Sequence, residues 1–326
     1  MTAPVIDRRD AFTVLGTDVS NSGTAYQALV DAGLAGMDVH KVPLYTGRGK
    51  IVEGAYTLED ASGEPLPKIT VGSDFTPVQY EDVATTLDAV ARRTGAVFDR
   101  CGKLDVRAYG IGGARAFISM RLPEQMRIGG TDLVDAYIVA FMSHGWNSNV
   151  LAPTGIRVEC ANQQPQFARS DDFKIVIRHT SSAQARHIAA EAALIKSVAA
   201  MKQAEAESLE MLNVRTTNEQ FREIVGHLWP LNSEAKGTTT RHANRLERLE
   251  VIRNAQTNAG IGGTAWGDYQ AILEHAQWVQ RIKGGDDGDT NLTAVRARRI
   301  LTANGLERDQ LKAYNIVREH VGLATS

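Results

Sequence analysis

The stretch that decides the fold covers residues 96–140 and reads AVFDRCGKLDVRAYGIGGARAFISMRLPEQMRIGGTDLVDAYIVA. Apolar residues recur at every second position in three segments, which run from Val97 to Ala108, Ala116 to Leu122 and Val134 to Ala140. This period places alternate side chains on opposite faces of a strand. Glycines at 110, 112, 113, 129 and 130 predict turns between the segments. Consecutive strands with short connections favour an antiparallel meander.

A helix is expected immediately before the meander. Thr76-Pro77-Val78-Gln79 has the pattern of a capping box, with Thr76 as the N-cap and proline at the first helical position. Val83, Leu87 and Val90 continue an apolar stripe at helical spacing. Gly95 is the expected stop of this helix.

The rest of the chain separates into two regions. Two further strand-like pieces occupy Gly155 to Glu159 and Phe173 to Ile177, and the sequence beyond residue 180 is helical. Residues 181–212 contain neither glycine nor proline and predict one long helix. We therefore predict an α+β fold, an α-β-β-β-α core with an antiparallel meander in residues 1–180 and an all-helical region in residues 181–326. Later helices are expected at Asn218–Leu228, Thr240–Gln256, Trp266–Ile282, Leu292–Ala303 and Arg308–Val321.

Composition excludes several classes of protein. No run of about 18 apolar residues occurs and the first residues lack a secretory signal, so we expect a cytoplasmic protein without membrane contact. Cys101 and Cys160 are too few for a disulfide framework in 326 residues and are expected in the core. The net charge of −2 gives no general attraction to nucleic acid.

Several short motifs follow one another along the chain. They are Val71-Gly72-Ser73 with Thr76-Pro77-Val78-Gln79, Ser143-His144, Thr154-Gly155-Ile156-Arg157-Val158-Glu159-Cys160-Ala161-Asn162, His179-Thr180 and Thr264-Ala265-Trp266-Gly267-Asp268-Tyr269. In this order, over a region from about Gly16 to Trp278, they resemble the phage/plasmid-like proteins of domain of unknown function 932. The resemblance implies an origin in a mobile genetic element of a bacterial host cell and brings no established reaction. It singles out His144, Asn162 and His179 as family-motif residues.

An enzyme with a metal or thiol site around His144, Cys160 and His179 is one alternative. These residue types suit zinc, but none of them has a partner at the short spacing of structural zinc sites, and we predict no metal. A cysteine–histidine nucleophile pair has no recognisable activating acid. The two GIGG segments, at 110–113 and 260–263, do not complete a nucleotide-binding motif, so no cofactor is expected.

The basic meander is the feature that favours a function. Between Arg92 and Arg127 eight basic residues accompany three acidic ones, an excess of five positive charges. Basic strands can follow a phosphate backbone, and an aromatic ring can stack on bases. The opposite interpretation is a solvated charged surface. The predicted nucleic-acid-binding residues are Arg100, Lys103, Arg107, Arg115, Phe117, Arg121 and Arg157.

The order of one helix, three strands and a further helix is similar to the core of ring-forming single-strand annealing recombinases of the RecT and Redβ type. This likeness implies a protein that binds and anneals single-stranded DNA as a homo-oligomer, in a ring or filament, without a nucleotide cofactor. A non-enzymatic scaffold or host-interaction protein is the remaining alternative. Under the annealing hypothesis the C-terminal helices are expected to serve assembly, and in a scaffold or host-interaction protein the long helices are expected to make the contacts.

Overall fold

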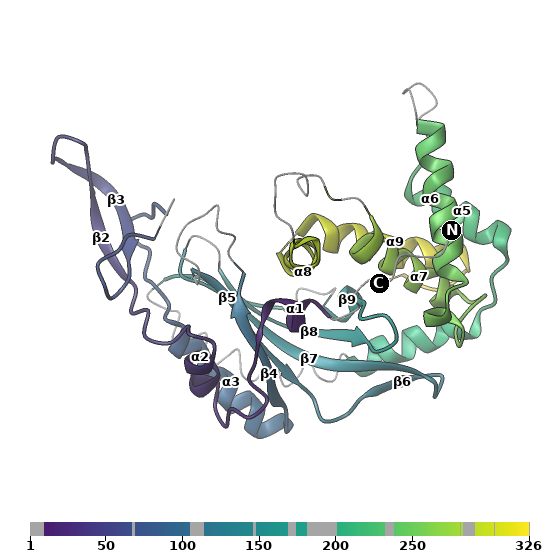
Figure 1. Cartoon of the computed structure of the whole chain (residues 1–326), viewed down its shortest axis with the longest axis horizontal. Helices are drawn as coiled ribbons and strands as arrows, with labels where there is room; N and C mark the ends of the chain where they lie inside the picture. The colour runs from purple at the N-terminus through teal and green to yellow at the C-terminus, as the bar shows by residue number, and fades with distance from the viewer. Residues whose placement is uncertain are drawn as a thin grey trace.

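The computed structural model describes residues 10–66, 69–104, 114–145, 148–168, 174–180, 201–231, 238–280, 282, 291–302 and 304–325. An antiparallel sheet occupies the middle of the molecule (Figure 1). Helices α2 (Ala25–Asp31) and α3 (Tyr80–Thr94) lie on one side of the sheet, and α8 (Leu292–Thr302) lies on the other. Most of the remaining helices gather at one end of the sheet.

The predicted meander is confirmed, although residues 105–113, which include the end of the first expected strand and the glycines of its turn, lie outside the described residues. β4 (Val97–Lys103), β5 (Arg115–Arg121), β7 (Asp132–Ser143) and β8 (Asn149–Arg157) are consecutive antiparallel neighbours in an eight-stranded sheet. The shorter strands of this sheet are β1 (Thr17–Asp18) beside β4, β10 (Ile175–Ile177) beside β8, β6 (Met126–Ile128) beside β7 and β9 (Gln163–Gln164) beside β8.

A separate two-stranded sheet precedes the meander. β2 (His40–Tyr45) and β3 (Ile51–Glu59) form a hairpin that projects from one end of the molecule (Figure 1). The sequence indicated only a mixed lead-in here, because its strands carry few alternating apolar residues and most of their side chains are partly or fully exposed.

Helix α3 begins later than the sequence predicts. Its N-cap is Gln79, whose side chain forms a reciprocal capping box with Asp82, so the expected cap at Thr76 is wrong. The backbone N–H groups of Thr76 and Val78 instead donate to the carbonyl oxygen and the Nδ1 atom of His179. These bonds hold the segment in a non-helical path. The expected stop at Gly95 is confirmed, and its φ of 72° is the left-handed conformation that favours glycine.

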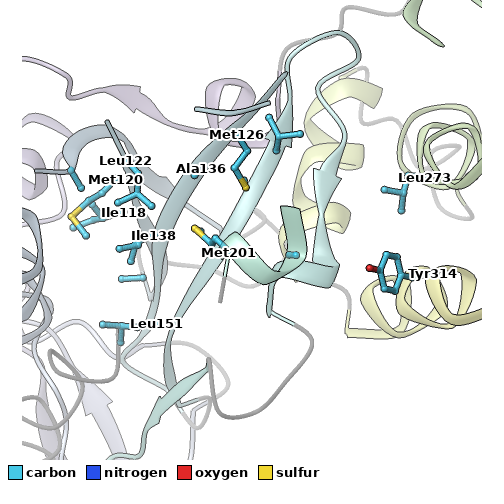
Figure 2. Close-up of a cluster of buried hydrophobic side chains, with 14 of the residues drawn as sticks. Ile118, Met120, Leu122, Met126, Ala136, Ile138, Leu151, Met201, Leu273 and Tyr314 are labelled. Carbon is cyan, nitrogen blue, oxygen red and sulfur yellow. The ribbon is translucent and has the colours of Figure 1, made fainter. Parts of the chain in front are cut away.

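The two faces of the sheet bury different apolar clusters. On one face, Ile118, Met120 and Ile138 are buried in the cluster that also contains apolar residues of α3 (Figure 2). On the other face, Phe117 packs with residues of α1 (Ala11–Leu15) and α8. The alternation predicted for β5 is therefore confirmed, although both faces carry an apolar cluster.

The helical half follows the sequence closely. Helices occur at residues 201–213, α5 (Asn218–Leu228), α6 (Thr238–Arg253), α7 (Ala265–Glu274), α8 and α9 (Asn304–His320). The helix expected beyond Trp266 continues from α7 as a π-helix over His275–Val279. Much of the long helix predicted over residues 181–212 lies outside the described residues. Two 3₁₀ helices, Pro165–Ala168 and Gln256–Asn258, lie between the longer elements.

The largest apolar cluster draws on both halves of the sequence. Ile138 of β7 belongs to it, and so do Trp266 of α7 and Tyr314 of α9. Burial of these side chains stabilises the sheet and the helices together. In the described ranges, no helix combines the length and the apolar character needed to cross a membrane.

Candidate nucleic-acid interface

The strand register decides where the basic residues of the meander point. Arg100 lies opposite Ser119, and residues 115, 117, 119 and 121 alternate onto one face of β5. Cross-strand partners share a face, so Arg100, Arg115 and Arg121 lie on the same side of the sheet. Lys103 lies opposite Ala116, whose side chain belongs to the other face, and it is exposed at the end of β4. Arg107 lies outside the described residues.

Phe117 lies in the middle of this face and is fully buried. Its ring packs on Phe12 of α1 at a centroid distance of 5.3 Å. The structure therefore leaves no exposed face of Phe117 on which a base could stack. Helix α1 also covers the strand between Arg115 and Arg121, so these arginines do not form one continuous groove.

Carboxylates accompany the arginines at one end of the face. Arg100 forms an ion pair of 3.2 Å with Asp18. Burial is the main cause that raises the pKa of Asp99, and Asp10 also raises it. Arg100 and Arg121 lower it. The charges of Arg100 and Arg121 are thus balanced locally by acidic groups.

Arg157 has a structural environment. It is 1% exposed, and its Nε atom donates to Asp132 at 2.7 Å. Its other nitrogens donate to the side chain of Asn258 at 2.9 Å and the carbonyl of Thr257 at 2.7 Å. Because Arg157 is buried and its nitrogens already donate to several acceptors, its guanidinium group is not accessible to a phosphate.

The two family-motif histidines lie on either side of Val78. His144 is buried, stacks on Tyr80 at 3.9 Å and donates from Nδ1 to the carbonyl of Val78 at 3.2 Å. The N–H of Val78 donates to Nδ1 of His179 at 3.2 Å. Burial is the main cause that lowers the pKa of His144 to about 3, and His179 lowers it further. Both histidines position the chain that enters α3.

Cys160 lies away from this pair, beside Arg157, which donates to its Sγ at 3.3 Å. Burial raises the pKa of Cys160 to about 11, so the thiol is protonated near neutral pH. A protonated, buried thiol is a poor nucleophile. In the described part of the chain, no three histidine, cysteine, aspartate or glutamate side chains are placed to hold a metal ion.

Asn162, the third family-motif residue, joins the sheet to α7. Its side-chain N–H donates to the carbonyl of Gln270 at 3.2 Å. Gln164 and Gln166 extend a buried chain of amides that reaches the hydroxyl of Tyr269. This network orients α7 against the strands.

A second set of arginines lies on the helical half, and sequence reasoning missed it. We call Arg245, Arg248, Arg296, Trp229 and His275 the basic–aromatic cluster. The guanidinium of Arg245 lies 4.8 Å from the centre of the Trp229 ring, a cation–π contact. The ring of Trp229 meets His275 edge to face at 6.0 Å.

The π-helix forms the base of this cluster, and both α6 and α8 pack against it. Short π-helices are rare and often occur at functional sites. Arg296 donates to the carbonyl of Gln280, immediately after the π-helix, at 3.0 Å. Nδ1 of His275 and Nε1 of Trp278 are buried, and neither has a hydrogen-bond partner within the described structure.

The electrostatics of the basic–aromatic cluster differ from those of the meander. Burial lowers the pKa of Arg245, and burial together with Arg299 lowers the pKa of Arg296. The pKa of His275 is lowered to about 4. Burial is the largest cause, and the positive charges of Arg245, Arg248 and Arg296 lower it further. As far as the structure is described, no carboxylate is among the causes of these three shifts.

The signal for this cluster is present in the sequence but is dispersed. Arg245 and Arg248 are three positions apart on one helix, and Arg296 lies about fifty residues further along the chain. Only the packing of α6 and α8 on the π-helix brings them together. A count of local charge cannot detect such an arrangement.

These features define an α+β protein in which a meander sheet and a helical half share one core, and in which three arginines of the helical half lie around His275. The chain belongs to the family described as Domain of unknown function (DUF932), whose model matches residues 69–301. No curated protein and no solved structure matches the chain.

Proposed function

We propose that this protein binds single-stranded DNA through its phosphates and anneals complementary strands as a homo-oligomer, without a nucleotide cofactor. The observation that supports binding is the basic–aromatic cluster. Three arginines from two helices surround His275, and no carboxylate among the described residues is a cause of the pKa shifts in the cluster.

The chemistry of the cluster suits a phosphodiester. Guanidinium groups form charge-assisted bonds to phosphate oxygens, and these bonds strengthen where water is partly excluded. Arg245 and Arg296 are half-buried, while Arg248 is exposed and can meet a ligand from solvent. An anion would relieve the repulsion among the three positive charges.

The ring of Trp229 contributes to the same site. It is partly exposed and already carries the guanidinium of Arg245. Arginine and aromatic planes are the elements with which proteins hold single strands without reading their sequence. Bases left free by such phosphate contacts remain able to pair.

The meander has a smaller part in this proposal than the sequence alone suggests. Lys103 is exposed and adds long-range attraction to DNA. Arg115 lies at the far end of β5 from Arg121. Phe117 and Arg157 act through packing and buried hydrogen bonds.

Annealing and self-association rest on the order of elements. Helix α3 followed by β4, β5 and β7 is similar in order to the core of annealing recombinases. Two features differ from the expected order, because β6 is inserted before β7, and β8, β9 and β10 follow β7 where a helix was expected. A phage or plasmid origin agrees with the same analogy.

The direct test is fluorescence anisotropy of a labelled oligothymidine at low salt. We expect wild type to bind and the Arg245→Ala/Arg296→Ala variant to bind at least tenfold more weakly. Arg222→Ala is the matched control, because Arg222 is already paired with Glu250 at 2.8 Å, and it should bind as wild type does. No binding by wild type, or equal binding by the double variant, would overturn the proposal.

A further inference from the structure

A cavity of about 420 Å³ lies on the side of the sheet that faces α8. Strands β5, β7, β8 and β10 contribute to its lining, and residues of α8 and α9 close it from the opposite side. This volume falls within the range of sites for small organic ligands. None of its lining residues belongs to the basic–aromatic cluster.

The floor of the cavity is mainly apolar. Phe141 lies opposite Val150 in the pairing of β7 with β8, and Val139 lies opposite Ala152. Phe141 is only partly buried, so a portion of its surface is open on this side of the sheet. An apolar floor with an aromatic residue favours a ligand that contains a flat, weakly polar ring.

Two buried amide groups in the lining have unused hydrogen-bonding capacity. Oε1 of Gln163 and Nε2 of Gln310 are buried, and neither has a partner within the described residues. A buried polar atom without a partner costs free energy, roughly 1–3 kcal/mol in typical proteins. A ligand that supplies both partners would remove this cost.

The orientation of Gln163 is fixed before any ligand binds. Its backbone N–H donates to Gln277 at 2.9 Å, and its carbonyl accepts from the same side chain at 2.8 Å. Its Nε2 donates to the hydroxyl of Thr154 at 3.3 Å. The side-chain oxygen is therefore left as the available acceptor.

Three charged residues belong to the lining, and each of them has a partner within the protein. Lys174 and Glu307 form an ion pair with each other, which cancels their charges, and Arg115 makes an interaction of its own. We propose that the cavity binds an uncharged heteroaromatic ring of nucleobase size. An N–H of the ring would donate to Oε1 of Gln163, and a ring carbonyl or nitrogen would accept from Nε2 of Gln310.

This assignment does not depend on the proposed binding of DNA phosphates, because the residues of the two sites differ. The Arg245→Ala/Arg296→Ala variant should retain the cavity and its ligand. If one kind of binding is absent while the other is present, the result shows which of the two proposals has failed.

Thermal unfolding of the full chain with free nucleobases tests the cavity. The probes are adenine, thymine, cytosine and 1,3-dimethylthymine, which is flat but lacks both ring N–H donors. We expect at least one of the first three at millimolar concentration to raise the Tm, since a ligand that binds only the folded state stabilises it. Dimethylthymine should leave the Tm unchanged. No shift with any base, or an equal shift with dimethylthymine, would overturn the proposal.

The variant Gln310→Leu makes the test specific. In the wild-type protein, Nε2 of Gln310 has no partner in the described structure. Removal of this group should therefore not lower the Tm of the free protein. The affinity for the base should fall at least tenfold. Gln203→Leu is the control, because Gln203 is exposed and bonded to Glu207 at 3.1 Å, and it should bind the base normally. Undiminished binding by Gln310→Leu would contradict the assigned hydrogen bond.

Discussion

The indole N–H of Trp266 donates a hydrogen bond of 2.7 Å to the carboxylate of Asp132. The other oxygen of that carboxylate accepts from Arg157, also at 2.7 Å. Asp132 begins β7, Arg157 ends β8 and Trp266 lies in α7. A single buried carboxylate thus joins the sheet to the helical half.

Replacement of Asp132 by Asn should destabilise the whole protein. The change leaves Arg157 buried without its counter-charge, which typically costs about 3–5 kcal/mol of the free energy of unfolding. Urea denaturation measures this loss. Glu250→Gln, which breaks the exposed pair with Arg222, should hardly move the midpoint. Similar midpoints for the two variants would show that the Asp132 network does not stabilise the fold.

Gly102→Ala should weaken the packing of α1 on the sheet. A Cβ atom at this position would lie 2.6 Å from the carbonyl oxygen of Leu15 and 2.8 Å from Cα of Gly16, both backbone atoms. Overpacking of this kind typically costs about 1–3 kcal/mol. Gly226→Ala in α5 meets no atom within 4 Å and is the control, expected to unfold at the wild-type temperature or slightly above it. A Gly102→Ala variant as stable as wild type would contradict the close approach.

His144 should make stability depend on pH. Its pKa is lowered to about 3 in the folded protein, whereas an unfolded histidine titrates near about 6.5. Between these values the unfolded state binds a proton that the folded state does not. The free energy of unfolding therefore falls as the pH falls, by about 2 kcal/mol for this group between pH 7 and pH 5.

The variant His144→Phe isolates this contribution. It retains a ring beside Tyr80 but cannot be protonated, so the difference in stability between pH 7 and pH 5 should become smaller. Chemical denaturation at the two pH values gives the comparison. An unchanged pH dependence in His144→Phe would show that His144 is not buried in its neutral form.

Neither thiol should react while the protein is folded. Burial raises the pKa of Cys101 and Cys160, to about 12 and about 11. The thiolate is the reactive form, so both cysteines should resist a thiol-specific reagent at pH 8. We expect labelling at least one hundredfold slower than in denaturant. Rapid labelling of native Cys160 would revive the thiol-enzyme hypothesis.

Local patterns predicted the helices and the meander well. Asn218–Leu228 was expected to be a helix, and α5 has these bounds. Thr217 and Gln220 form its capping box, a signal contained within four residues. The alternation of β5 was equally legible, because residues 115–121 strictly change face.

Long-range partners explain the remaining differences. Thr76 resembles a helix cap, but the carbonyl of His179, more than one hundred positions away, accepts its N–H. Arg157 looks like a surface residue in the sequence, and only its bonds to Asp132 and Asn258 reveal burial. The basic–aromatic cluster likewise requires two distant helices to meet at the π-helix.

The salt dependence of binding to single-stranded DNA tests the central claim most directly. Each phosphate contact releases condensed counterions, so the logarithm of the binding constant falls linearly with the logarithm of salt concentration, by about 0.7 per contact for single strands. The Arg245→Ala/Arg296→Ala variant removes two contacts, so we predict that its slope is shallower than that of wild type by about 1.4. We predict that Arg222→Ala has the same slope as wild type. Equal slopes for all three proteins would contradict phosphate binding by the basic–aromatic cluster.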